Sequence, residues 1–266
     1  MNGCSAPVYR RYVAMGDSFT EGVGDETLDG RCRGWADLVA GALGGAARPS
    51  GLDYANLAVR GKLLGQIVDD QLDAAIALRP DLVSLAGGGN DLLRPGARMP
   101  SLLRLLDLAV ARLADHNATV VMFTGADPFD RLPGSRFLRG QAQRFCDGVY
   151  RIAERRSTVL VDLWSDRDLR DVRYWAPDRL HLNPAGHRQV AARVLDALRA
   201  DRPAAWTAPE AEVPPPLHPL ADRARYYRRY VGPWVHRRLT GTSSGDGRTA
   251  KYPSPISVDV MGSSEG

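Results

Sequence analysis

The sequence predicts an α/β protein, a three-layer α/β/α sandwich around a mainly parallel sheet of five strands. Five short runs of branched apolar residues alternate with longer stretches of helical periodicity, a pattern that indicates βαβ units. The chain has 266 residues, 44% of them hydrophobic, which is enough for one sizeable core. The alternation stops at proline-rich sequence after residue 202, so we place one domain at residues 1–202.

Each apolar run has the length and composition of a buried strand. The expected strands are residues 8–15, 54–59, 81–86, 119–124 and 158–163, and the expected helices are residues 63–78, 101–114, 137–155 and 184–199. The last helix has the clearest boundaries. Asn183 can cap its N-terminus, Pro184 suits its first position, and Pro203 follows its end.

The sequence beyond this domain divides into three parts. Residues 203–266 contain a proline-rich linker, a basic aromatic segment at 222–239, and a polar, glycine-rich tail from residue 243 that we expect to be flexible. Between Arg223 and Arg238 the basic aromatic segment mixes arginines with tyrosines and a tryptophan. We favour a helix that packs on the sandwich through its aromatic side chains. The alternative is weak contact with a membrane surface or, less favoured, with nucleic acid.

Charge, hydropathy and cysteines disfavour several classes of protein. The formal net charge of +4 is modest for a nucleic-acid-binding protein. No stretch reaches the roughly 20 apolar residues of a membrane span, and no secretory signal precedes the first strand, so we expect a cytoplasmic protein. Cys4, Cys32 and Cys146 lack the spacing of a zinc site or a disulfide scaffold, and we expect free thiols. We expect no metal and no cofactor, because neither ligand clusters nor nucleotide-binding glycine loops have the required spacing.

The candidate nucleophile is Ser18, within residues 16–22 directly after the first expected strand. Open parallel sheets place their chemistry at the carboxyl ends of the strands. Far downstream, Asp178 and His181 offer a carboxylate and an imidazole that can meet if the loop coils through about one turn. Because a serine hydroxyl needs a base, and the base an orienting acid, these three residues supply the parts for nucleophilic acyl transfer.

Donors for an oxyanion are expected at the ends of the neighbouring strands. Gly61 follows the second strand and can offer a backbone N–H where a side chain would obstruct the approach of a substrate. Asn90 follows the third strand and can offer its side-chain amide. Together with the N–H of Ser18, they would make three donors.

Two rival residues have weaker claims to a catalytic role. His187 falls in the first turn of the last helix, where we expect a surface or packing residue rather than the base. Ser243 lies in Gly-Thr-Ser-Ser-Gly at 241–245, which matches the G-x-S-x-G nucleophile elbow, but no apolar strand precedes it and no helix follows. We interpret this match as chance.

Four ordered blocks over roughly residues 8–200 resemble the SGNH hydrolase superfamily, also called the GDSL family of esterases and lipases. The blocks are Gly16-Asp17-Ser18-Phe19, Asn56-Leu57-Ala58-Val59-Arg60-Gly61, Gly88-Gly89-Asn90-Asp91 and Asp178-Arg179-Leu180-His181-Leu182-Asn183. The resemblance implies a flavodoxin-like sandwich and a set of roles. The nucleophile, base and orienting acid would be Ser18, His181 and Asp178, and the oxyanion hole would comprise Ser18, Gly61 and Asn90. Phe19 stands where the family's name expects leucine, and we expect this apolar exchange to adjust packing and leave the chemistry intact.

The expected activity is hydrolysis of small-molecule carboxylic esters, with small or medium acyl groups, through an acyl-enzyme on Ser18. Two alternatives stay open. The same site could transfer the acyl group to an alcohol in place of water. In the other alternative, the chain chiefly binds a membrane surface or nucleic acid through the segment from Arg223 to Arg238, and its catalytic site is vestigial.

Overall fold

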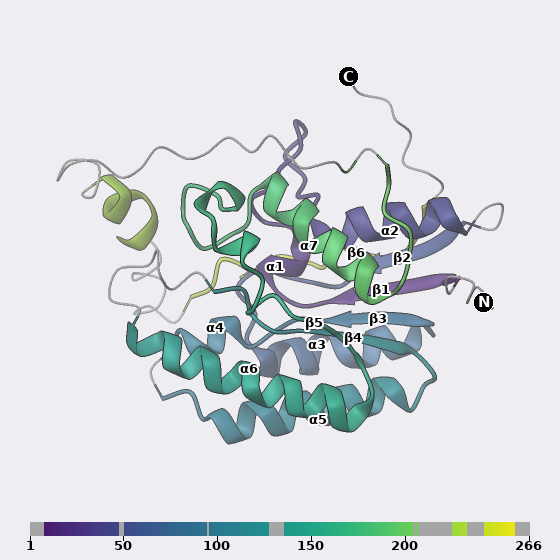
Figure 1. Ribbon diagram of the computed structural model, residues 1–266, viewed down its shortest axis with the longest axis horizontal. Helices are drawn as coiled ribbons and strands as arrows, with labels where there is room; N and C mark the ends of the chain where they lie inside the picture. The colour runs from purple at the N-terminus through teal and green to yellow at the C-terminus, as the bar shows by residue number, and fades with distance from the viewer. Residues whose placement is uncertain are drawn as a thin grey trace.

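A six-stranded sheet forms the centre of the molecule (Figure 1). The computed structural model describes residues 8–47, 51–94, 96–127, 136–204, 206, 225–232 and 242–258. The strands are β1 (Arg11–Met15), β2 (Leu52–Asn56), β3 (Leu82–Leu85), β4 (Thr119–Phe123), β5 (Val159–Val161) and β6 (Tyr252–Val258). They lie in the order β5-β4-β3-β1-β2-β6; β1 to β5 are parallel, and β6 pairs antiparallel with β2 at the edge.

Helices cover both faces of this sheet, which confirms the predicted α/β/α sandwich (Figure 1). On one face lie α2 (Trp35–Ala46) and α7 (Pro184–Ala197), and on the other lie α3 (Leu64–Ala77), α5 (Met99–Ala114) and α6 (Arg136–Arg156). Two single turns, α1 (Ser18–Glu21) and α4 (Gly89–Leu92), follow the carboxyl ends of β1 and β3. Three further short turns are η1 (Asp168–Arg170), η2 (Val172–Tyr174) and the π-helical η3 (Tyr227–Val231).

The central strand β1 shows why the expected strands are apolar throughout. Tyr12 and Ala14 face the core shared with α2 and α7, whereas Val13 and Met15 face the core shared with α3, α5 and α6. All four side chains are buried. A strand covered on both faces has no polar side, so the usual alternation gives way to a continuous apolar run.

Helix α2 occupies residues for which the sequence analysis predicts no helix. Three glycines within it lower its helix propensity and weaken the periodic signal. One of them, Gly44, is required by packing, because a Cβ at this position would collide with the carbonyl oxygen of Val258 on β6. Tertiary contact therefore favours a residue that local propensity disfavours.

The predictions of five strands and of a flexible tail are wrong for residues 252–258, which form the sixth strand. Pro253 and Pro255 made this segment resemble a loop, but an edge strand tolerates proline where its N–H would face solvent. Most side chains of β6 are exposed, so no apolar run marked it. Residues 259–266 lie outside the described residues. The domain boundary near residue 202 stays a prediction, and β6 returns to the sheet from beyond it.

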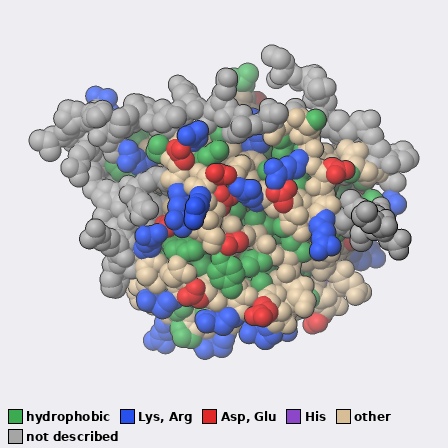
Figure 2. Space-filling model, viewed as in Figure 1, with side chains coloured by type: hydrophobic (Ala, Val, Ile, Leu, Met, Phe, Trp, Pro, Cys, Tyr) green, Lys and Arg blue, Asp and Glu red, His purple; other side chains and the backbone are tan. Residues whose placement is uncertain are grey.

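Of the basic aromatic segment, the structure describes residues 225–232. Tyr226 is buried there, whereas Arg228 and Arg229 are exposed, as expected of a helix that packs through aromatic side chains. The rest of residues 222–239 lies outside the described residues. On the face shown in Figure 2, basic and acidic side chains of the described residues are interspersed. Among the described helices, none has both the length and the apolar character to cross a membrane.

Candidate active site

Ser18 is the first residue of α1, directly beyond the carboxyl end of β1. The tight connection depends on Gly16, because a Cβ there would collide with the Thr20 side chain and approach the Ala86 carbonyl. The buried amide of Gln71, from α3, accepts a hydrogen bond from the Gly16 N–H at 2.8 Å and donates one to its carbonyl at 2.9 Å. Gln71 therefore holds both the N–H and the carbonyl of Gly16, two residues before Ser18.

Asp178 and His181 meet because the loop between them forms a tight turn. Arg179 adopts a left-handed φ of 60°, and one carboxylate oxygen of Asp178 accepts hydrogen bonds from the N–H groups of Leu180 and His181, each at 3.0 Å. The other oxygen lies 2.6 Å from Nδ1 of His181. Burial raises the pKa of Asp178, but the hydrogen bonds from His181 and the loop backbone outweigh it and hold that pKa below its ordinary value. Asp178 is thus an ionised acceptor at neutral pH.

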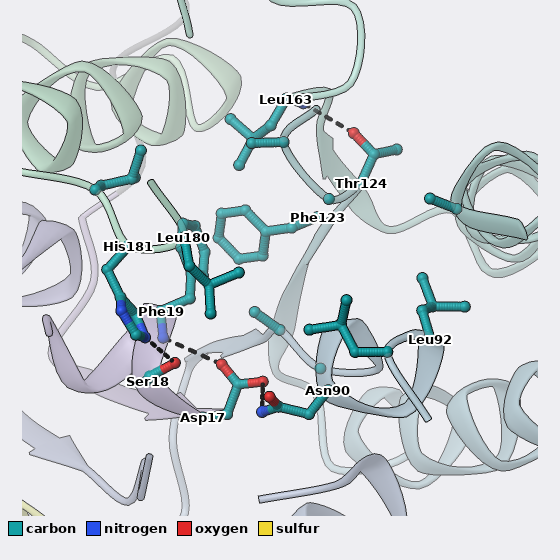
Figure 3. A pocket seen from close by; sticks show the side chains of 18 of the residues that line it. Asp17, Ser18, Phe19, Asn90, Leu92, Phe123, Thr124, Leu163, Leu180 and His181 are labelled. Atoms are coloured by element: carbon teal, nitrogen blue, oxygen red, sulfur yellow. Dashed lines mark hydrogen bonds between the residues drawn. The ribbon is translucent and has the colours of Figure 1, made fainter. Parts of the chain in front are cut away.

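The imidazole of His181 also reaches the serine hydroxyl. Its Nε2 lies 3.1 Å from Oγ of Ser18 (Figure 3). Since Asp178 is an acceptor, the proton of neutral His181 belongs on Nδ1, which leaves Nε2 free to accept from the Ser18 hydroxyl. The structure therefore brings together the three residues that the sequence analysis selected for nucleophilic chemistry.

Asn90, from α4, lies beside them with its amide already engaged. Nδ2 donates to a carboxylate oxygen of Asp17 and to the carbonyl of Lys62, each at 3.0 Å. Asp17 also caps α1, since its other oxygen accepts from the N–H of Phe19 at 3.1 Å. Burial raises the pKa of Asp17 to about 6, against the effect of these donors. Asp17 thus links the turn that carries the serine to the amide expected to stabilise an oxyanion.

Gly61 occupies a different setting from the other predicted site residues. A Cβ at this position would collide with Oγ of Ser243 and approach Oγ of Ser244, so a turn of the C-terminal segment covers it. Gly61 does not line the pocket that opens at Ser18, although Asn90 does. The structure therefore places Asn90, and not Gly61, at the pocket wall.

Ser243 itself belongs to this turn. Its N–H donates to Asp246, and its hydroxyl accepts from the N–H of Gly245 at 3.2 Å. A nucleophile elbow joins a strand to a helix, and here the residues that follow Ser243 form a turn instead. Residues 243–245 pack against Arg60 and Gly61.

His187 is a packing residue, which is one of the two roles expected from the sequence. It is fully buried, with Nδ1 accepting from the N–H of Trp35 and Nε2 facing the carbonyl of Val23, each at 3.2 Å. Burial lowers its pKa to about 4, so it stays neutral at pH 7. Cys32 and Cys146 are free thiols, whereas Cys4 lies outside the described residues. Among the described side chains, no group of three or more His, Cys, Asp or Glu could hold a metal ion.

A pocket of about 200 Å³ opens at Ser18 and His181. Figure 3 shows these two residues and Asn90 at one end, with Thr124 and Leu163 at the opposite end. Apolar side chains make up most of the wall, including Phe19, Leu92, Leu93, Phe123, Phe145, Trp164, Trp175 and Leu180. The site therefore combines a polar corner, where a bond could react, with an apolar interior.

Several supports of this site were not predicted from the sequence. Glu21, at the end of α1, accepts from the N–H and the guanidinium of Arg60, at 2.6 to 2.9 Å. Lys251, just before β6, donates to the carbonyl of Glu21 at 2.9 Å. Tyr226 donates through its hydroxyl to the carbonyl of Asp178 at 3.0 Å. These contacts join segments far apart in the chain, and no local sequence pattern predicts them.

Comparison with known proteins identifies similar folds and one matching family. Among solved structures, the chain resembles LAE5, an alpha/beta hydrolase enzyme from the metagenome of Lake Arreo, Spain, with 25% identity, a TM-score of 0.58, and coverage of 71% of this chain and 95% of LAE5. It also resembles a variant of Axe2, an acetyl xylan esterase from Geobacillus stearothermophilus, with 20% identity, a TM-score of 0.62, and coverage of 73% and 96%. Comparison with curated proteins gave no significant match. The model of the GDSL-like Lipase/Acylhydrolase family matches residues 14–189, more than half of the sequence, and the chain therefore belongs to this family.

Proposed function

We propose that this ester hydrolase cleaves carboxylic esters through an acyl-enzyme on Ser18. The observation that carries the proposal is the continuous relay from Asp178 to His181 at 2.6 Å and from His181 to Ser18 at 3.1 Å. It lies at the carboxyl edge of the sheet and opens on a pocket large enough for a substrate.

The relay supports a two-step reaction. Ser18 Oγ attacks the ester carbonyl while its proton passes to Nε2 of His181, and the Asp178 carboxylate stabilises the imidazolium that forms. The tetrahedral intermediate then collapses, and Nε2 returns the proton to the departing alcohol oxygen. Water repeats the sequence on the acyl-enzyme, which releases the carboxylic acid and restores the Ser18 hydroxyl.

For the oxyanion, we propose the N–H of Ser18, the side-chain amide of Asn90 and the N–H of Gly61. The first two belong to residues that line the pocket. Both hydrogens of the Asn90 amide bond to Asp17 and Lys62, so Asn90 exchanges one of these acceptors for the oxyanion when it donates. The proposal for Gly61 depends on the resemblance of its block to that of the family. Removal of one donor of this kind typically raises the activation barrier by about 3 to 4 kcal/mol.

The experiment is turnover of a p-nitrophenyl ester by the full chain and by Ser18→Ala. We expect this variant to lose more than about 10⁴-fold in kcat without a change in thermal stability. Ser243→Ala is the matched control, because Ser243 is the rival serine, and it should retain turnover. A fluorophosphonate should label Ser18 in peptide mapping. Labelling at another residue, or unchanged turnover in Ser18→Ala, would contradict the proposal.

Product analysis in the presence of a competing alcohol separates hydrolysis from acyl transfer at the same site. Free acid as the main product supports hydrolysis, whereas a new ester supports transfer. A full chain that turns over no ester but binds anionic vesicles or oligonucleotides would instead support a binding protein with a vestigial site.

A further inference from the structure

We propose that the apolar pocket beside Ser18 holds the acyl chain of the substrate, and that this chain is of medium length, about six to eight carbons. This inference rests on the proposed ester hydrolysis and names its substrate class. It predicts poor use of acetyl esters, whereas the structurally similar Axe2 is an acetyl xylan esterase.

The chemistry of the wall favours an alkyl chain over a carbohydrate or a charged group. Among the residues that line the pocket, the acidic side chain is that of Asp17 and the basic one that of His181, and both lie at the Ser18 end (Figure 3). Cys146, further along the wall, is buried, which raises the pKa of its thiol to about 11 and keeps it neutral. Hydroxyl groups of a sugar would lose water in such an interior without gaining partners, whereas methylenes gain from burial.

The size of the pocket sets the expected chain length. An apolar cavity of about 150 Å³ accepts a benzene ring. The pocket here measures about 200 Å³, so it accommodates roughly six to eight carbon atoms. An acetyl group would fill only a small part of this volume, and a chain much longer than eight carbons would extend beyond the pocket.

The direction of proton transfer assigns the pocket to the acyl group and not to the alcohol. His181 Nε2 must reach the departing oxygen, so the alcohol belongs on the His181 side of the scissile bond. In Figure 3 Asn90 and Leu92 lie across from His181, and Thr124, at the far end of the pocket, lies on their side of the view. The acyl chain can follow this course while the alcohol points away from the interior.

Helix α6 supplies three of the side chains that line the pocket. Ala142, Phe145 and Cys146 stand at spacings of three and four residues, so they share one helix face, and all three line the pocket. Ala142 is the smallest of the three. A larger side chain at this buried position would take up pocket volume, which makes Ala142 a residue that determines specificity.

The test measures kcat/KM of the full chain for p-nitrophenyl esters from acetate to decanoate. We expect about a fourfold rise for each added methylene until the pocket is full, and then a fall. Esters of acetic acid with alcohols from ethanol to hexanol should differ by less than about threefold, because the alcohol lies outside the pocket. Acetate as the preferred acyl group, or dependence on alcohol length alone, would overturn the proposal.

Ala142→Leu should move the optimum to chains shorter by two or more carbons, a change of profile that an equal loss of activity on every ester would not produce. Glu154→Leu is the matched control, since it introduces the same leucine side chain at an exposed position of the same helix. It should leave the chain-length profile unchanged. If Ala142→Leu does not fold, inhibition of the wild-type chain by alkylboronic acids of graded length gives an independent measure. We expect the same optimum length, and equal inhibition at every length would contradict the pocket.

The outcomes separate this inference from the proposed function. Acetate preference together with turnover that depends on Ser18 would refute the acyl pocket and leave the esterase proposal intact. Absence of turnover on every ester, or turnover that persists in Ser18→Ala, would refute the proposed function itself.

Discussion

The two ends of the chain contribute to the candidate site in different ways. Residues 8–200 supply every group to which we assign chemistry, including Ser18, Asn90 and His181. Residues 225–258 supply none of these groups, but Lys251 and Tyr226 from this region each bond the backbone of a segment that carries one. The comparison separates the residues that we propose to react from the residues that hold their segments in place.

The turn α1, which carries Ser18, is supported both from within the family domain and from the C-terminal region. From within the family domain, the carboxylate of Glu21 binds Arg60. From the C-terminal region, the ammonium of Lys251 donates to the carbonyl of Glu21, to that of Arg33 and to the carboxylate of Asp37. The buried lysine thus joins α1, the loop before α2, and α2 itself. Removal of the C-terminal region would therefore take away part of the scaffold as well as a tail.

The largest effect expected in this comparison is a loss of stability in Lys251→Met. The ammonium and the Asp37 carboxylate lie 2.6 Å apart with side-chain exposures of 10% and 7%, so the substitution leaves a buried carboxylate without its cation. We expect the free energy of unfolding to fall by about 3 to 5 kcal/mol. Urea titration measures it. Lys62→Met is the matched control, because Lys62 pairs with a half-exposed Asp70, and it should cost less than about 1 kcal/mol.

The pH dependence of this loss has a defined sign. Burial raises the pKa of Asp37 to about 6 even beside Lys251. An acid whose pKa is raised by folding favours the folded state below its unfolded pKa, near 4, and loses that contribution as pH rises through the folded value. The penalty of Lys251→Met should therefore be larger at about pH 8 than at about pH 5. An equal or smaller penalty at pH 8 would contradict the burial of an unpaired charge.

The second prediction tests a support that lies wholly within the family domain. Burial lowers the pKa of His187 to about 4, whereas an unfolded histidine titrates near 6.5. The stability that neutral His187 contributes is complete above about pH 6.5 and is lost as pH falls through about 4, with a total near 3 kcal/mol. His187→Gln should remove this part of the acid destabilisation in urea titrations at about pH 7 and pH 4.5. The exposed His116, changed to Gln, should leave the acid destabilisation intact.

The residues that we propose to react could be selected from the sequence because chemistry restricts their types and the sheet restricts their places. A serine after β1, an amide after β3 and an acid with a base before α7 have few substitutes. The alternation of strands and helices likewise predicts the sandwich, since buried parallel strands must be apolar on both faces.

The supporting residues could not be predicted, because their roles arise only when distant segments meet. Gln71 holds Gly16 across 55 positions of sequence, and Lys251 reaches Glu21 across 230. Neither has a local pattern. Strand β6 was missed for a related reason, since an exposed edge strand with two prolines lacks the apolar run that marks a buried one.

The smallest effect is expected at Tyr226, where the C-terminal region contacts the acid–base loop. Its hydroxyl donates to the Asp178 carbonyl, and its ring lies beside the Arg179 guanidinium, 5.5 Å from the ring centroid. Tyr226→Phe keeps the ring and removes the hydrogen bond, so we expect about 1 kcal/mol of lost stability. Since Asp178 still holds His181 through its side chain, kcat on a p-nitrophenyl ester should change by less than about threefold, with an unaltered pH profile. Tyr230→Phe, at a neighbouring half-exposed ring, is the control. A large fall in kcat with a displaced pH profile would instead make Tyr226 a positioning residue for the relay. The C-terminal region would then contribute to the proposed chemistry as well as to stability.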